Sequence, residues 1–267
     1  MSPRRRLLVA ALVLVVVAVG VIVGVRVSGG PGLPLPGTRP ADDRPGPVLL
    51  VPGYGGSRAS LQVLARRIEA TGRQATVLTL VGDGTGDLSA QVTVLDRAVD
   101  DALAAGAPSV DVVGYSAGGV VTALWLARDD GAAKARRVVT LGAPLHGTTL
   151  ATAGASLAPD ACPVACRQLV PGSPELTEIE RAEVGGELPW LSLWTTDDDT
   201  VTPPESARLA GALDTSVQAV CAGARVTHSG LPTDPLVTGA VLRALGTTPL
   251  TVPGPPDCAT LRGAGRG

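Results

Sequence analysis

Residues 110–128 read VDVVGYSAGGVVTALWLAR, and this stretch decides the expected fold. Its first part is rich in valine and predicts a strand, whereas residues 118–128 predict a helix. The turn between them has the pattern G-x-S-x-G, with Ser116 at its centre. In this context the serine lies on a sharp strand-to-helix turn that presents its hydroxyl group. The pattern therefore predicts Ser116 as a nucleophile.

The glycines around Ser116 support this interpretation. A sharp turn brings backbone segments close together, so the flanking positions cannot carry bulky side chains. Gly114, Gly118 and Gly119 meet that requirement. The helix that follows directs its free N–H groups at the serine, which favours negative charge near the serine oxygen.

Strand-like and helix-like runs alternate along the rest of the chain. Such alternation predicts an α/β fold with a mostly parallel sheet and helices on both faces. In this architecture functional groups collect beyond the carboxyl ends of the strands. The strands are predicted at 48–51, 75–80, 110–113, 137–141, 191–194 and 217–220, and the helices at 60–71, 88–105 and 118–128.

A serine nucleophile needs a base, and the chain has two histidines. His228 lies downstream of the candidate acids, which matches the chain order Ser, Asp, His of α/β-hydrolases. His146 precedes every suitable acid, and its alternative role is to line a pocket or shape a loop. We therefore predict His228 as the base.

Three consecutive acids at 197–199 follow the strand predicted at 191–194. The third member of a triad holds the tautomer of the imidazole and stabilises the imidazolium. Asp198 begins a D-x-x-V spacing that is typical of the acid loop in this fold, so it is preferred over Asp197 and Asp199. The alternative is that all three belong to a solvated turn.

The first predicted strand leads into VPGYGG at 51–56, where glycines allow backbone amides to approach a ligand closely. The amides of Tyr54 and Ala117 are the predicted donors of an oxyanion hole. An ordinary glycine-rich turn is one alternative. A phosphate-binding loop is another, although the G-K-[ST] ending of a P-loop is missing.

The N-terminal segment predicts an extracytoplasmic protein. Residues 4–6 are arginines, and residues 7–25 are free of charge and long enough to approach the hydrocarbon core of a bilayer, roughly 30 Å. We predict an uncleaved membrane anchor within residues 1–27, with a cleavable signal sequence as the alternative. The positive-inside bias then places the remainder outside the cytoplasm. Residues 28–46 read as a linker rich in Pro and Gly, and 47–267 as one catalytic domain.

Cysteine content and net charge indicate the redox compartment and the possible partners. The four cysteines suit two disulfides in an oxidising compartment, and we favour Cys162 with Cys166 and Cys221 with Cys258 among the three possible pairings. A zinc site is the rival interpretation, but it lacks a C-x-x-C pair or a nearby histidine. The net charge of −2, from 22 basic and 24 acidic residues, gives no indication of nucleic-acid binding. We expect no metal, no organic cofactor and a monomer.

The motifs also carry a resemblance. Residues 48–56, 110–119 and 138–144, with the acid segment and HSGL at 228–231, resemble the small bacterial α/β-hydrolase lipases of the lipase class 2 type. The resemblance covers most of 48–245 and implies a triad of Ser116, Asp198 and His228, with Tyr54 and Ala117 as the oxyanion amides. The chain differs from the family pattern in having Pro52 where a histidine is usual. Its segment 148–189 is also longer than in the smallest members, and is predicted to cap the active site.

These observations imply a carboxylic ester hydrolase, a lipase or esterase that acts on lipid acyl esters outside the cytoplasm. One alternative is an acyltransferase with the same fold, in which a cell-envelope lipid accepts the acyl group. The other is an anchored binding protein that keeps the fold without turnover.

Overall fold

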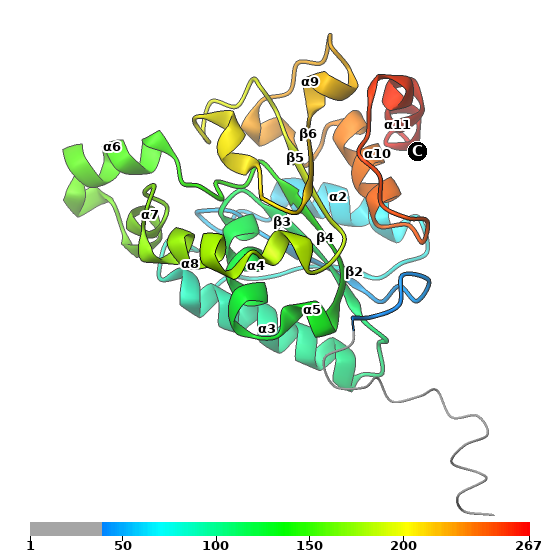
Figure 1. Cartoon of the computed structure of the whole chain (residues 1–267), viewed down its shortest axis with the longest axis horizontal. Helices are drawn as coiled ribbons and strands as arrows, with labels where there is room; N and C mark the ends of the chain where they lie inside the picture. Colours follow the sequence, from blue (N-terminus) through cyan, green and yellow to red (C-terminus); the bar gives the residue numbers. More distant parts are fainter. Residues whose placement is uncertain (1–38) are drawn as a thin grey trace, which may run out of the picture. The chain divides into compact units, whose positions relative to one another are not determined.

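The computed structural model describes residues 39–267, whose strands form one parallel sheet (Figure 1). The spatial order is β2-β1-β3-β4-β5-β6, and every neighbouring pair is parallel. The carboxyl ends of all the strands therefore lie at one edge of the sheet. The strands are β1 (Val48–Val51), β2 (Ala75–Val77), β3 (Val110–Tyr115), β4 (Ala135–Leu141), β5 (Trp190–Trp194) and β6 (Leu213–Ser216).

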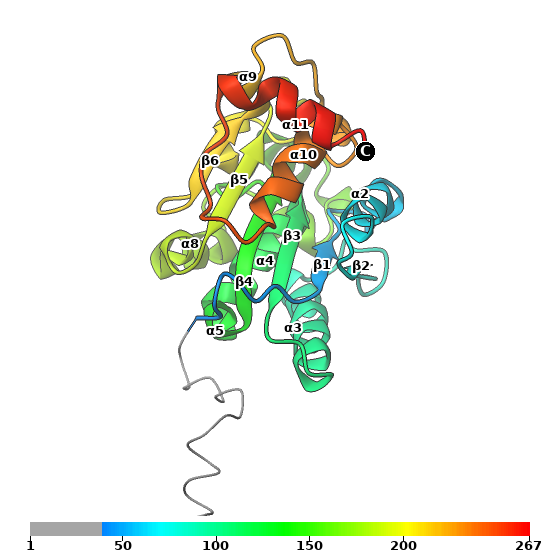
Figure 2. The ribbon, with the colours of Figure 1, turned by 90° about the vertical axis from the view of Figure 1, so that its right-hand side faces the viewer.

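Helices cover both faces of the sheet, which confirms the predicted α/β architecture. One face carries α3, α4 and α8, and the other carries α2, α9, α10 and α11 (Figure 2). The bounds are α2 (Ala59–Glu69), α3 (Leu88–Ala104), α4 (Ala117–Arg128), α5 (Gly131–Lys134), α6 (Thr149–Leu157), α7 (Val164–Gln168), α8 (Pro174–Ala182), α9 (Val217–Val220), α10 (Pro235–Ala244) and α11 (Cys258–Ala264).

Alternation along the strands produces two hydrophobic cores. In β1, Leu49 and Val51 pack into the core beneath α3 and α4, whereas Val48 and Leu50 pack beneath α2 and α10. Successive side chains of a strand point to opposite faces, so a strand buried on both sides is apolar throughout. The chain has no phenylalanine, and these cores consist mostly of Val, Leu and Ala.

The prediction of a last strand at 217–220 is wrong. These residues form the short helix α9, and the last strand is β6, immediately before it. The side chain of Ser216 accepts a hydrogen bond from the amide of Ala219, which caps the first turn of the helix. Val217 and Val220 are three residues apart, so both are buried on the same helical face. The strand predicted at 75–80 is also shorter, because pairing with β1 ends at Val77.

A buried ion cluster joins the amino ends of β3 and β4 to the end of α10. Asp111 and Arg136 are 0% exposed, and Nε of Arg136 donates to Oδ1 of Asp111 at 3.0 Å. Nη1 of Arg73 lies 2.7 Å from the other oxygen of Asp111. Arg136 also donates to the carbonyl groups of Leu245 and Gly246, which follow α10. The cluster lies at the opposite end of β3 from Ser116.

The predicted membrane segment, residues 7–25, lies outside the described residues, as does most of the predicted linker at 28–46. Among residues 39–267, no helix combines the length and the apolar character needed to cross a membrane.

Candidate active site

Ser116 occupies the sharp turn between β3 and α4. Its backbone has φ 53° and ψ −128°, an unusual conformation for a residue with a side chain. The amide of Ser116 donates to the carbonyl of Leu141 at 2.9 Å, which holds the turn against the end of β4. A strained serine at the carboxyl edge of a parallel sheet is the geometry that the sequence pattern predicts.

Close backbone contacts explain the glycines around this turn. A Cβ atom on Gly118 would lie 2.2 Å from the carbonyl oxygen of Val51, and one on Gly119 would lie 2.4 Å from Cβ of Ala143. These distances are far below van der Waals contact. The amino end of α4 can therefore approach the neighbouring strands only because both positions lack a side chain.

His228 reaches Ser116 from the loop that follows α9. It begins a single 3₁₀ turn, η4 (His228–Gly230), and its Nε2 lies 2.9 Å from Oγ of Ser116. His228 is only 5% exposed, so the residues around it hold its imidazole in place. The second histidine, His146, is exposed on the loop after β4, and its backbone amide bonds to Ser206.

Of the three consecutive acids, the structure brings Asp198 to the imidazole. Its Oδ2 lies 2.8 Å from Nδ1 of His228, and its Oδ1 accepts from the amides of Thr200 and Val201 at 3.0 and 2.7 Å. Two backbone donors fix the carboxylate in one orientation. Asp199 is exposed, whereas Asp197 is partly buried and lies 3.6 Å from the guanidinium of Arg225.

Thr195 ties the loop of Asp198 to the loop of His228, and Gln218 of α9 bonds to Thr195; sequence reasoning missed both. The hydroxyl of Thr195 donates to the carbonyl of Val226 at 2.6 Å, and Nε2 of Gln218 donates to that hydroxyl at 2.9 Å. These contacts join residues 31 and 23 positions apart, so no local sequence signal could have found them.

Two further residues pack directly against the histidine. The hydroxyl of Tyr115 donates to the carbonyl of His228 at 3.3 Å, and the two rings lie 5.2 Å apart. Burial raises the pKa of Tyr115 to about 12, with the charges of Asp198 and Asp199 adding to the effect. Gly142 has φ 54°, and a Cβ there would lie 3.1 Å from Nδ1 of His228. A side chain at position 142 would therefore crowd the contact between the histidine and the acid.

Of the two predicted oxyanion residues, Ala117 directly follows Ser116, and Tyr54 lines the same cavity as Ser116. Ala117 is the first residue of α4, where an amide has no partner within the helix. Gly53, which precedes Tyr54, passes so close to the serine that a Cβ on it would lie 2.9 Å from Cβ of Ser116. Neither the amide of Tyr54 nor that of Ala117 donates a hydrogen bond to another residue within 39–267. Both donors are thus available to a ligand.

An apolar cavity of about 270 Å³ opens beside Ser116. The segment between β4 and β5, predicted as a cap at 148–189, supplies much of its wall through α6 and α7. These two helices follow β4 in the sequence and contact each other. They lie at the left of Figure 1. The lining residues are Tyr54, Ser116, Pro144, Thr148, Leu150, Ala151, Gly154, Cys166, Leu169, Thr200 and Val201.

The cysteines pair as Cys162–Cys166 and Cys221–Cys258, the combination favoured from the sequence. The first disulfide lies in the segment that lines the cavity. The second joins the end of α9 to the start of α11. Within residues 39–267, no group of three His, Cys, Asp or Glu side chains is arranged to hold a metal ion.

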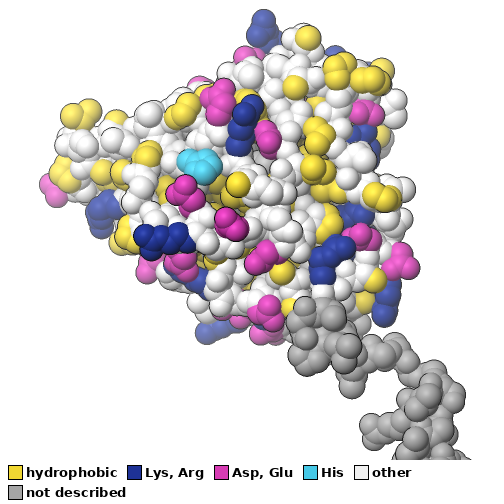
Figure 3. All heavy atoms as spheres, viewed as in Figure 1, with side chains coloured by type: hydrophobic (Ala, Val, Ile, Leu, Met, Phe, Trp, Pro, Cys, Tyr) yellow, Lys and Arg dark blue, Asp and Glu magenta, His cyan; other side chains and the backbone are white. Residues whose placement is uncertain are grey.

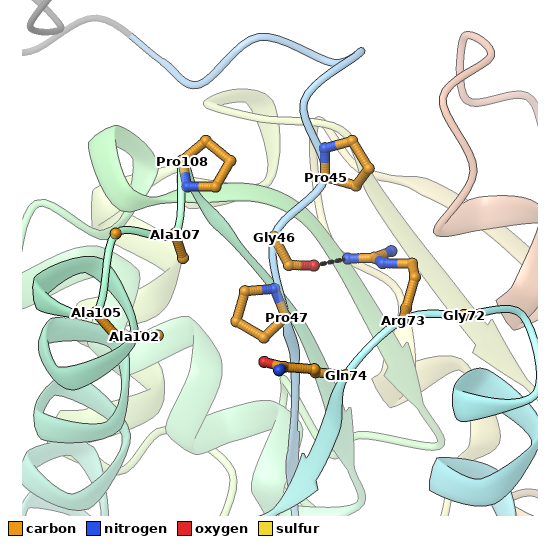
Figure 4. Close-up of a pocket in the computed structure, with 11 residues that line it drawn as sticks. Pro45, Gly46, Pro47, Gly72, Arg73, Gln74, Ala102, Ala105, Ala107 and Pro108 are labelled. Carbon is orange, nitrogen blue, oxygen red and sulfur yellow. Dashed lines mark hydrogen bonds between the residues drawn. The ribbon is translucent and has the colours of Figure 1, made fainter.

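A larger cavity, about 490 Å³, lies near the amino ends of the strands (Figure 4). Among the described residues that line it, Arg73 is the only charged one, and its guanidinium donates to the carbonyl of Gly46. The same side chain pairs with Asp111. This cavity therefore offers neither a nucleophile nor a base, and the smaller cavity beside Ser116 is the candidate site.

No protein-family model matches the chain, and no curated protein matches it in sequence. Solved structures of lipases are nevertheless similar to it. Lipase B of Aspergillus fumigatus gives a TM-score of 0.67 at 18% identity, over 83% of this chain and 57% of the lipase. The chain thus spans little more than half the length of that enzyme.

Two other similar structures are matched over nearly their whole length. The mature lipase BlEst2 of Bacillus licheniformis gives a TM-score of 0.62 at 18% identity, over 82% of this chain and 96% of the lipase. A structure from the metagenome-derived lipolytic enzymes LipS and LipT gives 0.57 at 19% identity, over 79% and 98%. Together with the parallel sheet and the turn at Ser116, these similarities show that the chain has the α/β-hydrolase fold.

Proposed function

We propose that this protein is a serine carboxylic ester hydrolase of the lipase or esterase type. The observation that carries the proposal is the continuous hydrogen-bonded line from Ser116 through His228 to Asp198, with contacts of 2.9 and 2.8 Å, beside an apolar cavity. Nucleophile, base and orienting carboxylate in this order are the requirements for acyl transfer through a serine. Support for an ester substrate also comes from the lipases and lipolytic enzymes that share the fold.

In the first half of the reaction, Oγ of Ser116 attacks the carbonyl carbon of the ester as Nε2 of His228 takes the hydroxyl proton. The tetrahedral intermediate then expels the alcohol, which leaves with the proton carried by His228. The acyl group stays on Ser116 as an ester. Asp198 holds Nδ1–H of the imidazole and stabilises its positive charge while the proton is on Nε2.

In the second half, a water molecule replaces the alcohol. The oxygen of this water attacks the acyl carbonyl while His228 takes one of the water protons. His228 then returns the proton to Oγ of Ser116 when the fatty acid leaves. The same base therefore serves both steps, and the enzyme returns to its starting protonation state.

The amides of Tyr54 and Ala117 stabilise the oxyanion of each tetrahedral intermediate. Both amides lack a partner within residues 39–267, and Ala117 lies at the positive end of α4. A single oxyanion donor contributes on the order of 10²- to 10³-fold to kcat in serine hydrolases. Backbone donors at these two positions would serve without dependence on a side chain.

The cavity and the disulfides suggest the substrate and the compartment. An apolar cavity next to the serine suits the hydrocarbon part of a lipid acyl ester. Two disulfides suit an oxidising environment. The proposed enzyme acts outside the cytoplasm, held at the membrane by residues 7–25.

The test is the hydrolysis of nitrophenyl esters from acetate to palmitate by wild type and by Ser116→Ala. Hydrolysis of at least one ester by wild type, lost in Ser116→Ala, supports the proposal. Ser229→Ala is the matched control, because Ser229 is exposed beside His228 and its hydroxyl bonds to Thr227 instead of Ser116. Equal turnover by wild type and Ser116→Ala would exclude the proposed mechanism.

A further inference from the structure

The cavity beside Ser116 is closed on one side by two short helices of the segment between β4 and β5. Helix α6 contributes Leu150, Ala151 and Gly154, whose spacing places them on one face of the helix. Cys166 of α7 and Leu169 at its end also line the cavity. None of these five residues carries a charge, so the wall favours a hydrocarbon chain.

The Cys162–Cys166 disulfide lies at a contact between α7 and α6. A Cβ atom on Gly154 would lie 3.2 Å from Sγ of Cys166 and 3.8 Å from Sγ of Cys162. Helix α6 therefore packs on the two sulfur atoms at the position where it has no side chain. Cys162 is fully buried, and its bond to Cys166 constrains the cavity-lining sulfur within the segment 162–166.

The surroundings of this wall are apolar as well. Leu150 and Leu157 of α6 are 59% and 85% exposed, and Val164 of α7 is also exposed. Hydrophobic side chains reach the surface at the left of Figure 3, over α6 and α7. Polar contacts also hold α7: the amide of Ala165 donates to the carbonyl of Thr85 at 3.1 Å, and Nε2 of Gln168 donates to Asp87 and Glu175. The disulfide adds a covalent constraint at Cys166, where α7 meets the cavity.

We propose that the Cys162–Cys166 disulfide, packed against Gly154, sets the length of the acyl chain that the site accepts. This inference rests on the proposed ester hydrolase function. A methylene group is similar in size to a water molecule, which occupies about 30 Å³ in the liquid. The cavity of about 270 Å³ thus holds a medium acyl chain, on the order of eight carbons, before the chain meets the wall.

Each buried methylene contributes about fourfold to affinity. For wild type we expect kcat/KM to rise from the acetyl to the octanoyl ester by up to this factor for each added carbon, and then to level off. Gly154→Val adds three carbon atoms between α6 and the sulfurs, and we expect the displaced Cys166 to shorten the cavity by about two to three methylenes. Octanoyl turnover then falls on the order of tenfold or more relative to butyryl turnover, whereas butyryl turnover changes little.

Removal of the disulfide has the opposite effect. In the double variant Cys162→Ser and Cys166→Ser the wall yields, and we expect the ratio of lauroyl to octanoyl turnover to rise severalfold. Two controls separate this from general loosening. Ala153→Val changes an exposed position of the same helix, and Cys221→Ser with Cys258→Ser removes the disulfide between α9 and α11. Both controls should keep the wild-type dependence on chain length.

A second measurement is independent of turnover. Calorimetric titration of Ser116→Ala protein with straight-chain fatty acids of four to twelve carbons reports the length at which affinity stops rising. The plateau should lie near eight carbons and move to shorter chains in Gly154→Val. If wild type hydrolyses no ester, the proposed function fails. The titration still shows whether the wall limits the length of the bound chain. A chain-length profile that is the same in wild type, Gly154→Val and the Cys162/Cys166 variant overturns the inference and leaves the proposed function intact.

Discussion

Replacing Asp198 with asparagine should abolish nearly all turnover while the protein stays folded. Oδ1 of Asp198 accepts hydrogen bonds from two backbone amides, at 3.0 and 2.7 Å. In Asp198→Asn the amide oxygen must take that position, because an NH₂ group there would face two donors. The NH₂ group then takes the place of Oδ2, which lies 2.8 Å from Nδ1 of His228.

This orientation inverts the tautomer of the base. Nδ1 of His228 now accepts a hydrogen bond, so the proton of the neutral imidazole resides on Nε2, 2.9 Å from Oγ of Ser116. A protonated Nε2 cannot take the hydroxyl proton. The same exchange in other Ser-His-Asp enzymes costs about 10⁴-fold in kcat, which corresponds to about 5.4 kcal/mol in the activation free energy.

The assay is kcat/KM on the best nitrophenyl ester, with the urea midpoint as the check on folding. Asp197→Asn and Asp199→Asn are the matched controls, because neither side chain contacts the imidazole. They should stay within about fivefold of wild type, since solvent-accessible charges contribute at most about 1 kcal/mol. A folded Asp198→Asn protein within about tenfold of wild type, or an equal loss in Asp199→Asn, would refute the reasoning.

Three further predictions concern the surroundings of the site. Gly118→Ala should lower the free energy of unfolding by about 1–3 kcal/mol and reduce kcat, because its methyl group would collide with β1. Gly263→Ala is the control and should be neutral or stabilising, because its methyl group would enter open space. The urea midpoint and kcat of both variants test this. Asp111→Asn should lower the free energy of unfolding by about 3–5 kcal/mol without changing KM, because it leaves the charge of the buried Arg136 uncompensated. Denaturant unfolding measures this change, and a decrease below about 1 kcal/mol would contradict the prediction. Tyr115 has a pKa of about 12 in the folded state and near 10 in the unfolded state, so the unfolded state loses the proton first as the pH rises. The free energy of unfolding should therefore fall between pH 10 and 12. Tyr115→Phe should show a smaller fall in the urea midpoint over this range, and an equal fall in both proteins would exclude Tyr115 as the cause.

Local signals in the sequence were sufficient for the turn at Ser116. The strand, the glycines and the helix all lie within residues 110–128. The glycines are needed because the backbone around them lies close to the next turn or to an adjacent segment. The alternation of strands and helices likewise predicted the parallel sheet. The last strand was assigned wrongly, because Val217 and Val220 suit a buried strand as well as one face of a short helix.

Long-range contacts could not be predicted in the same way. Sequence spacing left three acids open at 197–199, and only the fold of the acid loop directs Asp198 at the imidazole. The bonds of Thr195 to the loop of His228 depend on where two distant loops meet. The pairing of Asp111 with Arg136 depends on the register of β3 against β4, which nothing in either strand alone specifies.

Mass spectrometry of the protein after reaction with a fluorophosphonate tests Ser116 as the nucleophile most directly. Peptide mapping should locate a single phosphonyl adduct on Ser116, formed more slowly in Asp198→Asn and absent from Ser116→Ala. Excess short-chain ester should protect wild type from the reaction. An adduct on another residue, or an unmodified Ser116 in folded protein that still hydrolyses esters, would contradict the assignment.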